Sequence, residues 1–190
     1  MLYPEGCYGQ RHWELRMRAN QIAGYSLFDL LIALAIVGLL MGIATPAVSV
    51  WHERQQLHSL KTGLFHMTSK ARYLAMTSQS RVTLCPLSEQ GLCQRSWSGS
   101  ISSFIDGNGN RRLDPGEEIL GTLYLPSSIS LHWRGMLPNN SIHFSSQGVT
   151  FVSNGTMSLC PDNPGARTGA VVISRQGRVK TSSEDARCPQ

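Results

Sequence analysis

The chain has 190 residues, which is enough for one domain with a hydrophobic core and too few for two large ones. Its formal net charge of +5 permits an anionic partner but does not require one. No G-x-S-x-G, H-E-x-x-H or phosphate-loop pattern occurs in the sequence. No enzyme class is therefore indicated, and no cofactor is expected.

A long uncharged run follows a short polar N-terminal segment. From Leu30 to Trp51, 22 residues carry no charged side chain, and as a helix they would span about 33 Å, enough to cross a bilayer core. Three basic residues precede the run and place the N-terminus in the cytoplasm: Arg11, Arg16 and Arg18. A cleaved secretory signal would have a shorter apolar core, and a plain anchor leaves Gly24 and Asp29 unexplained.

The stretch Gly24–Asp29 (GYSLFD) resembles a type IV prepilin signal. By that resemblance residues 1–24 are a leader peptide, a prepilin peptidase cuts after Gly24, and Tyr25 becomes the N-methylated first residue. Tyr25 stands where the family usually has Phe, and Asp29 stands where it usually has Glu. The resemblance implies a single-pass protein of the bacterial inner membrane, with its C-terminal domain in the periplasm.

Two residues of this region acquire roles in filament assembly by the same resemblance. Asp29 would meet the free N-terminal amine of a neighbouring subunit, because a carboxylate in hydrocarbon is costly unless it is neutralised or paired. Pro46 would bend or locally melt the helix, because proline removes a helical hydrogen bond. The alternatives are an acid that lies at the membrane interface and an ordinary helix kink.

Beyond Trp51 the pattern becomes amphipathic. Apolar residues recur at spacings of three and four, which indicates a helix with one buried face: Leu57, Leu60, Leu64, Met67, Ala71 and Leu74. The sequence therefore predicts one helix from Tyr25 to about Thr77, with residues 25–51 in the membrane or filament core and residues 52–80 as its amphipathic half. A coiled coil is the alternative, but the stripe lasts under three heptads.

The remainder of the chain, residues 81–190, has the texture of short strands separated by Gly, Asn, Pro and Asp. One long helix followed by short strands predicts an α+β fold, with an antiparallel sheet packed on the helix. The last stretch has the pattern of a hairpin around Gln176 and Gly177. The expected strand regions are 81–85, 100–106, 118–126, 129–133, 141–145, 148–153, 156–160 and 169–180.

Four of the five cysteines follow the apolar run, which indicates two disulfides in an oxidising compartment: Cys85, Cys93, Cys160 and Cys188. Four cysteines allow three pairings. Proximity along the chain favours a short local loop from the first two and a tie of the chain end from the last two. No C-x-x-C pair occurs, and no His stands at ligand spacing from a Cys, so a zinc site is not indicated.

Three segments together resemble the GspH/FimT family of minor pilins and pseudopilins: TLCPLSEQGLCQRSWSGSISSFIDGNGNRRLDPGEEIL, NGTMSLCP and AVVISRQGRVK. The shared features are a cysteine pair around a loop, a tryptophan, an acidic turn and a terminal Gly-Arg hairpin. The resemblance covers nearly the whole mature chain. It implies a type IV pilin-like fold and a structural subunit of a type IV pilus or of a type II secretion pseudopilus, near the filament tip.

The same resemblance suggests a second role, in DNA uptake. Some members of the family carry a Gly-Arg-x-Arg motif that holds DNA, and this chain has Gly177-Arg178-Val179-Lys180 at the corresponding place. Lysine keeps the charge but loses the bidentate geometry of arginine. Arg175, Arg178 and Lys180 are thus candidate contacts to a DNA backbone. The alternative is a solvated basic edge that discourages pairing between strands of different molecules.

The stretch DGNGNRRLDPGEE has oxygen-bearing side chains at positions 1, 3, 5, 9 and 12 of an EF-hand-like loop, which suits Ca²⁺: Asp106, Asn108, Asn110, Asp114 and Glu117. Position 6 is Arg111, where a calcium loop has the glycine that allows a sharp turn. Asp-Gly and Asn-Gly are also ordinary turn sequences. A plain hydrogen-bonded turn is the alternative to a calcium site, and it is the one that we favour.

Overall fold

The computed structural model describes residues 26–136, 140–163, 165–183 and 186–188, and for residues 43–47 it describes the backbone alone. The expected cleavage pair, Gly24 and Tyr25, lies outside the described residues, as does the side chain of Pro46. The chain divides into two compact units, residues 1–44 and 45–190. One helix, α1 (Leu27–Thr77), begins in the first unit and continues into the second.

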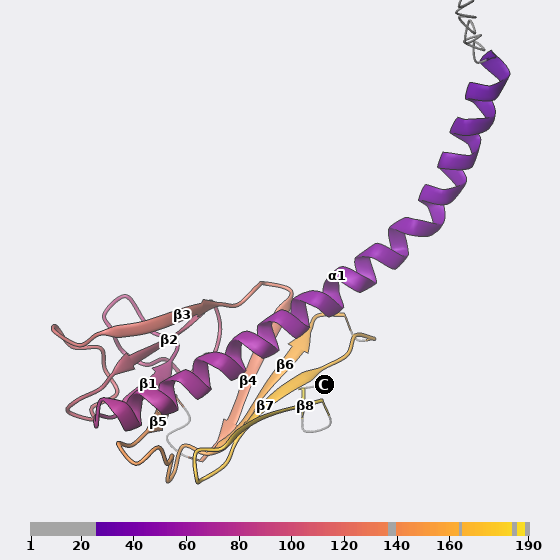
Figure 1. Cartoon of the computed structure of the whole chain (residues 1–190). Coiled ribbons are helices and arrows are strands. Elements are labelled where there is room, and N and C mark those ends of the chain that lie inside the picture. Colours follow the sequence, from indigo (N-terminus) through magenta and orange to yellow (C-terminus); the bar gives the residue numbers. More distant parts are fainter. Residues whose placement is uncertain (1–25, 137–139, 164, 184–185, 189–190) are drawn as a thin grey trace, which may run out of the picture. The chain divides into compact units, whose positions relative to one another are not determined.

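The strands of the second unit form two four-stranded antiparallel sheets (Figure 1). One has the order β3-β2-β1-β5 and the other the order β4-β6-β7-β8. The α+β fold with antiparallel strands is therefore confirmed. The strands are β1 (Val82–Cys85), β2 (Ser100–Ile105), β3 (Ile119–Tyr124), β4 (Ile129–Gly135), β5 (Ile142–Phe144), β6 (Gly155–Pro161), β7 (Gly169–Ile173) and β8 (Val179–Ser182).

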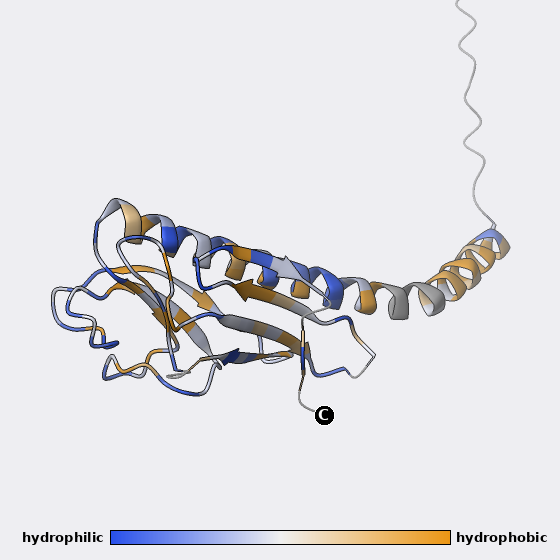
Figure 2. Ribbon diagram, turned by 90° about the horizontal axis from the view of Figure 1, so that it is seen from below, coloured by the Kyte–Doolittle hydropathy of each residue, from blue (hydrophilic) through white to orange (hydrophobic). Residues whose placement is uncertain are grey.

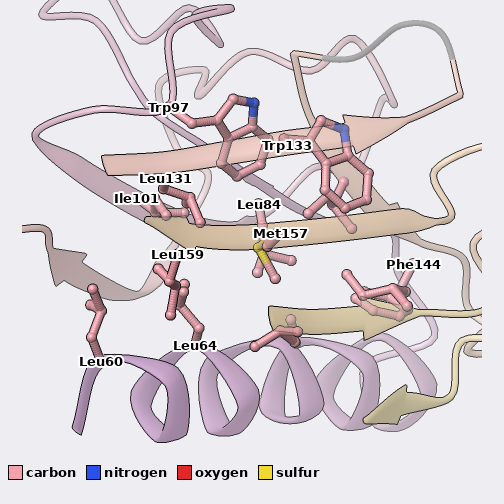
Figure 3. Close-up of a cluster of buried hydrophobic side chains, with 14 of the residues drawn as sticks. Leu60, Leu64, Leu84, Trp97, Ile101, Leu131, Trp133, Phe144, Met157 and Leu159 are labelled. Carbon is pink, nitrogen blue, oxygen red and sulfur yellow. The ribbon is translucent and has the colours of Figure 1, made fainter. Parts of the chain in front are cut away.

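The apolar stripe of α1 packs on the inner faces of both sheets, as its spacing predicted. Leu57, Leu60, Leu64 and Ala71 are buried, while Met67 and Leu74 are partly buried against the same core. Figure 3 shows Leu60 and Leu64 pointing from the helix toward the strand residues Met157 and Leu159. The helix and the two sheets thus share one core in the second unit.

Two glycines make room for the indole ring of Trp133, on β4. Gly135 and Gly155 are paired across β4 and β6. A Cβ atom added at Gly135 would lie 2.6 Å from Trp133 Cε2, and one added at Gly155 would lie 2.8 Å from Cη2. Trp133 also contacts Trp97, with ring centroids 5.8 Å apart. The missing side chains let the ring lie over the strand pair, an arrangement that compensates for glycine in a sheet.

The expected strand at 148–153 is wrong, because this segment forms turns. The amide of Gly148 donates to Ser145 O, and Gly148 has φ 72°. A second turn follows, in which the amide of Ser153 donates to Thr150 O and Phe151 has φ 47°. The segment is rich in β-branched and aromatic residues like a strand, but it forms turns and no strand ladder.

Both disulfides have the pairing that proximity favoured. Cys85 bonds to Cys93, with a sequence separation of 8, and Cys160 bonds to Cys188, with a separation of 28. We call them the short-loop and long-loop disulfides. The long-loop disulfide holds the C-terminal segment on the outer face of β6, where the amide of Arg187 also donates to Ser158 Oγ at 3.1 Å. This explains why Ser158 is only 2% exposed on the face that points away from the core.

In the first unit, α1 carries exposed apolar side chains, which Figure 2 colours as hydrophobic. Leu27, Phe28, Leu39 and Met41 are each more than 60% exposed. Within the described residues, which leave out the side chains of residues 43–47, no helical stretch has both the length and the hydropathy needed to cross a bilayer.

Candidate functional site

The start of α1 is closed by a reciprocal pair of side-chain hydrogen bonds. The amide of Phe28 donates to Ser26 Oγ at 3.3 Å, and the amide of Ser26 donates to Asp29 Oδ2 at 3.0 Å. Ser26 is therefore the N-cap and Asp29 the third helical residue of a capping box. A carboxylate in the first turn also interacts favourably with the helix dipole. Asp29, expected to act between subunits, thus has a role within its own chain.

The C-terminal hairpin predicted around Gln176 and Gly177 is confirmed, with β7 and β8 as its strands. Val171 and Ile173 are buried, and Val179 packs partly buried against the same core. Neighbouring residues of a strand point to opposite faces. Arg178 and Lys180, which flank Val179, therefore project away from the core, and both are exposed.

The tip of this hairpin is fixed to the rest of the unit by backbone contacts. Gly177, with φ 75°, closes the turn by donating its amide to Ser174 O at 2.8 Å. The amide of Thr150 donates to Arg175 O at 3.1 Å. A Cβ atom at Gly177 would collide with Gly148 O, which accepts a hydrogen bond from Arg72 Nε of α1 at 2.9 Å. The three basic side chains are therefore presented on a tip with defined backbone geometry.

In the loop at 106–117, the carboxylates of Asp114 and Glu117 accept hydrogen bonds from donors of the same loop. Asp114 Oδ2 accepts from Asn108 Nδ2 at 2.8 Å and Asn110 Nδ2 at 2.7 Å. These two hydrogen bonds, with a smaller contribution from Arg112, lower the pKa of Asp114. Glu117 accepts from the amides of Gly107 and Asp114, both at 3.0 Å.

Asp106, the first residue of that loop, is buried apart from this arrangement. Its Oδ2 accepts from Thr83 Oγ1 at 2.7 Å and from the Arg111 amide at 3.2 Å. Among the described residues, no three His, Cys, Asp or Glu side chains form a group that could hold a metal ion. Arg111 takes the left-handed conformation (φ 62°) that a glycine usually provides. These hydrogen bonds and this backbone conformation are those of a turn, and the calcium site stays a prediction.

A buried polar cluster lies on the face of the first sheet that points away from α1. His143 Nδ1 and Ser153 Oγ are 2.6 Å apart, and Thr83 is paired with His143 across β1 and β5. Burial, with smaller contributions from the charges of Arg81 and Arg111, lowers the pKa of His143 to about 4, and the charge of Asp106 opposes this shift.

The members of this cluster resemble those of a hydrolase triad in type, but they are closed off from solvent. His143, Ser153 and Asp106 are 4%, 1% and 0% exposed. A substrate could not reach the hydroxyl without opening the loop above it. The arrangement is that of a neutral imidazole satisfied inside a polar core, and it indicates a structural role.

Sequence reasoning missed two of these features. The capping box has a signal in the sequence, Ser26-x-x-Asp29, because Ser followed three residues later by an acid at the start of an apolar run is a helix-start pattern. The buried His143 cluster has none, because its members come from β1, β5, and the loops at 106 and 153, which only the folded sheet brings together.

Comparison with known proteins shows where this fold belongs. Residues 64–177 match the family described as "Type II transport protein GspH". Over 165 residues the chain is 31% identical to the pilin-like protein PilA1 of Thermus thermophilus, covering 83% of this chain and 96% of that protein.

Two solved structures have the same fold. The type IV minor pilin FimU of Pseudomonas aeruginosa superposes with a TM-score of 0.53 at 17% identity, covering 72% of this chain and 96% of the FimU chain. The minor pseudopilin EpsH of the Vibrio cholerae type 2 secretion system superposes with a TM-score of 0.50 at 11% identity, covering 68% and 98%. The chain therefore belongs to the GspH family of pilin-like proteins, and it has the type IV pilin-like fold.

Proposed function

We propose that the chain is a structural subunit of a type IV pilus or of a type II secretion pseudopilus, and that it has no catalytic activity. The observation that carries this proposal is the difference in side-chain exposure between the two parts of α1. Its first part exposes apolar side chains, and its second part is buried on a pilin-like domain. An exposed apolar helix needs a partner in lipid or in other subunits, and equivalent helices of neighbouring subunits would supply one in a filament.

The route to the filament follows from the prepilin-like signal. The N-terminus would stay in the cytoplasm, with residues 25–51 in the inner membrane and the β-rich domain in the periplasm. A prepilin peptidase would cut after Gly24 and methylate Tyr25. Because FimU is a minor pilin and EpsH a minor pseudopilin, we place the subunit at low abundance, near the filament tip. Deleting the gene would separate the two systems: loss of pili supports the first, and loss of protein secretion supports the second.

We propose that Asp29 pairs with the N-terminal amine of a neighbouring subunit during assembly. The capping box supplies a sharp test, since capping needs an oxygen acceptor whereas pairing needs a negative charge. Asp29→Asn keeps an acceptor in about the same place and removes the charge. Asp29→Glu keeps the charge with one more methylene, and Asp29→Ala removes both.

If the charge matters, the Asn and Ala variants should both fail to enter filaments while the Glu variant enters them. All three should still be cleaved after Gly24. Incorporation of the Asn variant at the wild-type level would show that Asp29 acts only as a helix cap. Filaments would be sheared from cells, and the subunit measured by immunoblot against the total cell content.

A second candidate function is DNA binding by the hairpin tip, and the exposure of Arg178 and Lys180 away from the core favours it. Contacts to phosphates would make binding independent of sequence and weaker at higher salt. With duplex DNA and residues 52–190, the variant Arg178→Ala/Lys180→Ala should flatten the slope of log affinity against log salt by about 2.

A matched control for this test removes two exposed cations that belong to neither proposed site, Arg95→Ala/Arg134→Ala, and should leave the slope unchanged. Equal losses in the two variants would indicate a general charge effect, and they would rule out a site at the hairpin.

A further inference from the structure

A hollow beside α1, separate from the hairpin tip, collects positive charge where the uncharged run ends. It is lined by the helix face of Trp51, Arg54, His58 and Lys61 and by Arg167 and Thr168 of the segment before β7, with a volume of about 370 Å³. The helical residues recur at spacings of three, four and three, which places them on one face of a helix.

The segment that carries Arg167 lies close to α1 because the next strand, β7, begins at Gly169 in contact with the helix. A Cβ atom added at Gly169 would lie 3.2 Å from Lys61 Cδ and 3.8 Å from Leu57 Cδ1. The aliphatic stem of Lys61 therefore rests on the start of β7, and Arg167 lies two residues before this point. The absence of a side chain at Gly169 is what lets the lysine stem lie against the strand.

Among the described residues, the cations of this hollow form no ion pair with an acid. This holds for Arg54, Lys61 and Arg167. The nearest acid along the helix, Glu53, lines an adjacent pocket together with Arg54 and Arg167, but it forms no ion pair with them and accepts a hydrogen bond from Asn163 Nδ2 at 3.3 Å. Arg54 and Arg167 are exposed and Lys61 is half-buried, so all three can meet a ligand from solvent or from a membrane surface.

An exposed tryptophan marks the level at which that ligand would sit. Trp51 is 63% exposed and ends the uncharged run. Indole rings gather at the headgroup level of membranes. Arg54 follows Trp51 by about 4.5 Å along the helix axis, which is within the headgroup layer. Guanidinium groups bind phosphate through two parallel hydrogen bonds, and an ammonium group adds a point charge.

We propose that this hollow binds the phosphate headgroup of an anionic phospholipid, with Trp51 at the headgroup level and Arg54, Lys61 and Arg167 around the phosphate. The proposal rests on the membrane insertion proposed above. Such a site would hold the subunit at the membrane surface before assembly. It would need to release the lipid when the helix moves into a filament, because the same helix face then meets other subunits.

The test uses the mature full chain in detergent micelles and short-chain phosphatidylglycerol as the probe, with binding followed by the fluorescence change that Trp51→Phe abolishes. The variant Arg54→Gln/Lys61→Gln/Arg167→Gln should bind on the order of a hundredfold more weakly. The control Arg95→Gln/Arg112→Gln/Arg134→Gln removes the same charge from exposed positions elsewhere, and it should bind like wild type.

Two further ligands show whether the site recognises an anionic lipid, any lipid, or phosphate alone. Phosphatidylcholine of the same chain length should bind at least tenfold more weakly than phosphatidylglycerol, and inorganic phosphate should not compete at equal concentration. Equal binding of the two lipids, competition by inorganic phosphate, or an unchanged triple variant would each overturn the proposal. So would a triple variant that binds lipid normally but fails to enter filaments, because the surface would then serve a neighbouring subunit.

Membrane insertion is measured independently, by alkaline extraction of cell membranes. A chain that is released by alkali but prefers phosphatidylglycerol would contradict the proposed insertion and leave the headgroup site in place. A chain that stays in the membrane but shows no lipid preference would support the proposed insertion and contradict the headgroup site.

Discussion

Acidification should weaken the β-rich domain through one buried histidine. His143 has an ordinary pKa of 6.5, which the unfolded chain retains, and a pKa of about 4 in the folded protein. Between pH 6.5 and 4 the histidine is protonated in the unfolded state and neutral in the folded state. The free energy of unfolding therefore falls as pH falls through this range. A difference of 2.5 pKa units corresponds to about 3 kcal/mol of unfolding free energy lost across this window.

Urea unfolding of residues 52–190 over a pH series measures this loss. The fragment keeps the whole buried cluster, whose members run from Leu57 to Val179. His143→Gln removes the titration while keeping a group that can hydrogen-bond to Ser153, and the difference between the two proteins isolates the histidine. The lowered pKa of Asp114 acts below 3.8, outside the window. An equal pH slope in wild type and variant between pH 6.5 and 4 would refute the reasoning.

Three further comparisons, each between two variants, test side-chain packing and loop closure. Leu64→Ala, at a helix residue 1% exposed, should cost about 2–5 kcal/mol of unfolding free energy, and Tyr73→Ala, at 61% exposure on the same helix, should change it by less than about 0.5 kcal/mol. Gly155→Ala should cost about 1–3 kcal/mol because the added methyl group would collide with the backbone of Arg134 and Gly135 and with the Trp133 ring, whereas the added methyl group of Gly107→Ala meets nothing within 4 Å, and that variant should be neutral by thermal melting. Replacing the long-loop disulfide with serines should cost about 3–4 kcal/mol and replacing the short-loop one about 2–3; the opposite order in urea unfolding would contradict the loop-closure account.

Local periodicity explains what the sequence could predict. The spacing of apolar residues from Leu57 to Leu74 identifies the buried face of α1, because a helix repeats every 3.6 residues whatever it packs against. The two disulfides were within reach for a similar reason, since each closes the loop that is shortest along the chain. The hairpin of β7 and β8 was marked by Gly177, the residue that its turn requires at φ 75°.

Features that depend on contacts between distant parts of the chain could not be predicted from the sequence. The division of the strands into two sheets depends on pairings such as β1 with β5, which are distant in the chain. The 148–153 segment has the β-branched and aromatic residues of a strand. Thr150, however, donates its amide to Arg175 O and its hydroxyl to Ser174 O, so contacts with the β7–β8 turn determine the path of the segment.

The same distinction between local periodicity and long-range contacts applies to the candidate sites. Arg178 and Lys180 face the same way because strand periodicity requires it, and this could be predicted. Arg167 joins Arg54 and Lys61 only because the loop before β7 reaches the helix, which the sequence does not reveal. The capping of α1 by Asp29 could have been predicted from the spacing of Ser26 and Asp29, whereas the pairing of Asp29 with a neighbouring subunit is implied only by the resemblance to a prepilin signal.

The N-terminal peptide of the protein recovered from its own membranes tests the central claim most directly, because a filament subunit of this kind must be processed before it assembles. Digestion and mass spectrometry should find a first residue of Tyr25 carrying one additional methyl group on its amine. A chain that retains residues 1–24, or one cut at a site after the apolar run, would contradict the assignment of Gly24 as the end of a leader. It would also remove the free amine with which Asp29 is proposed to pair.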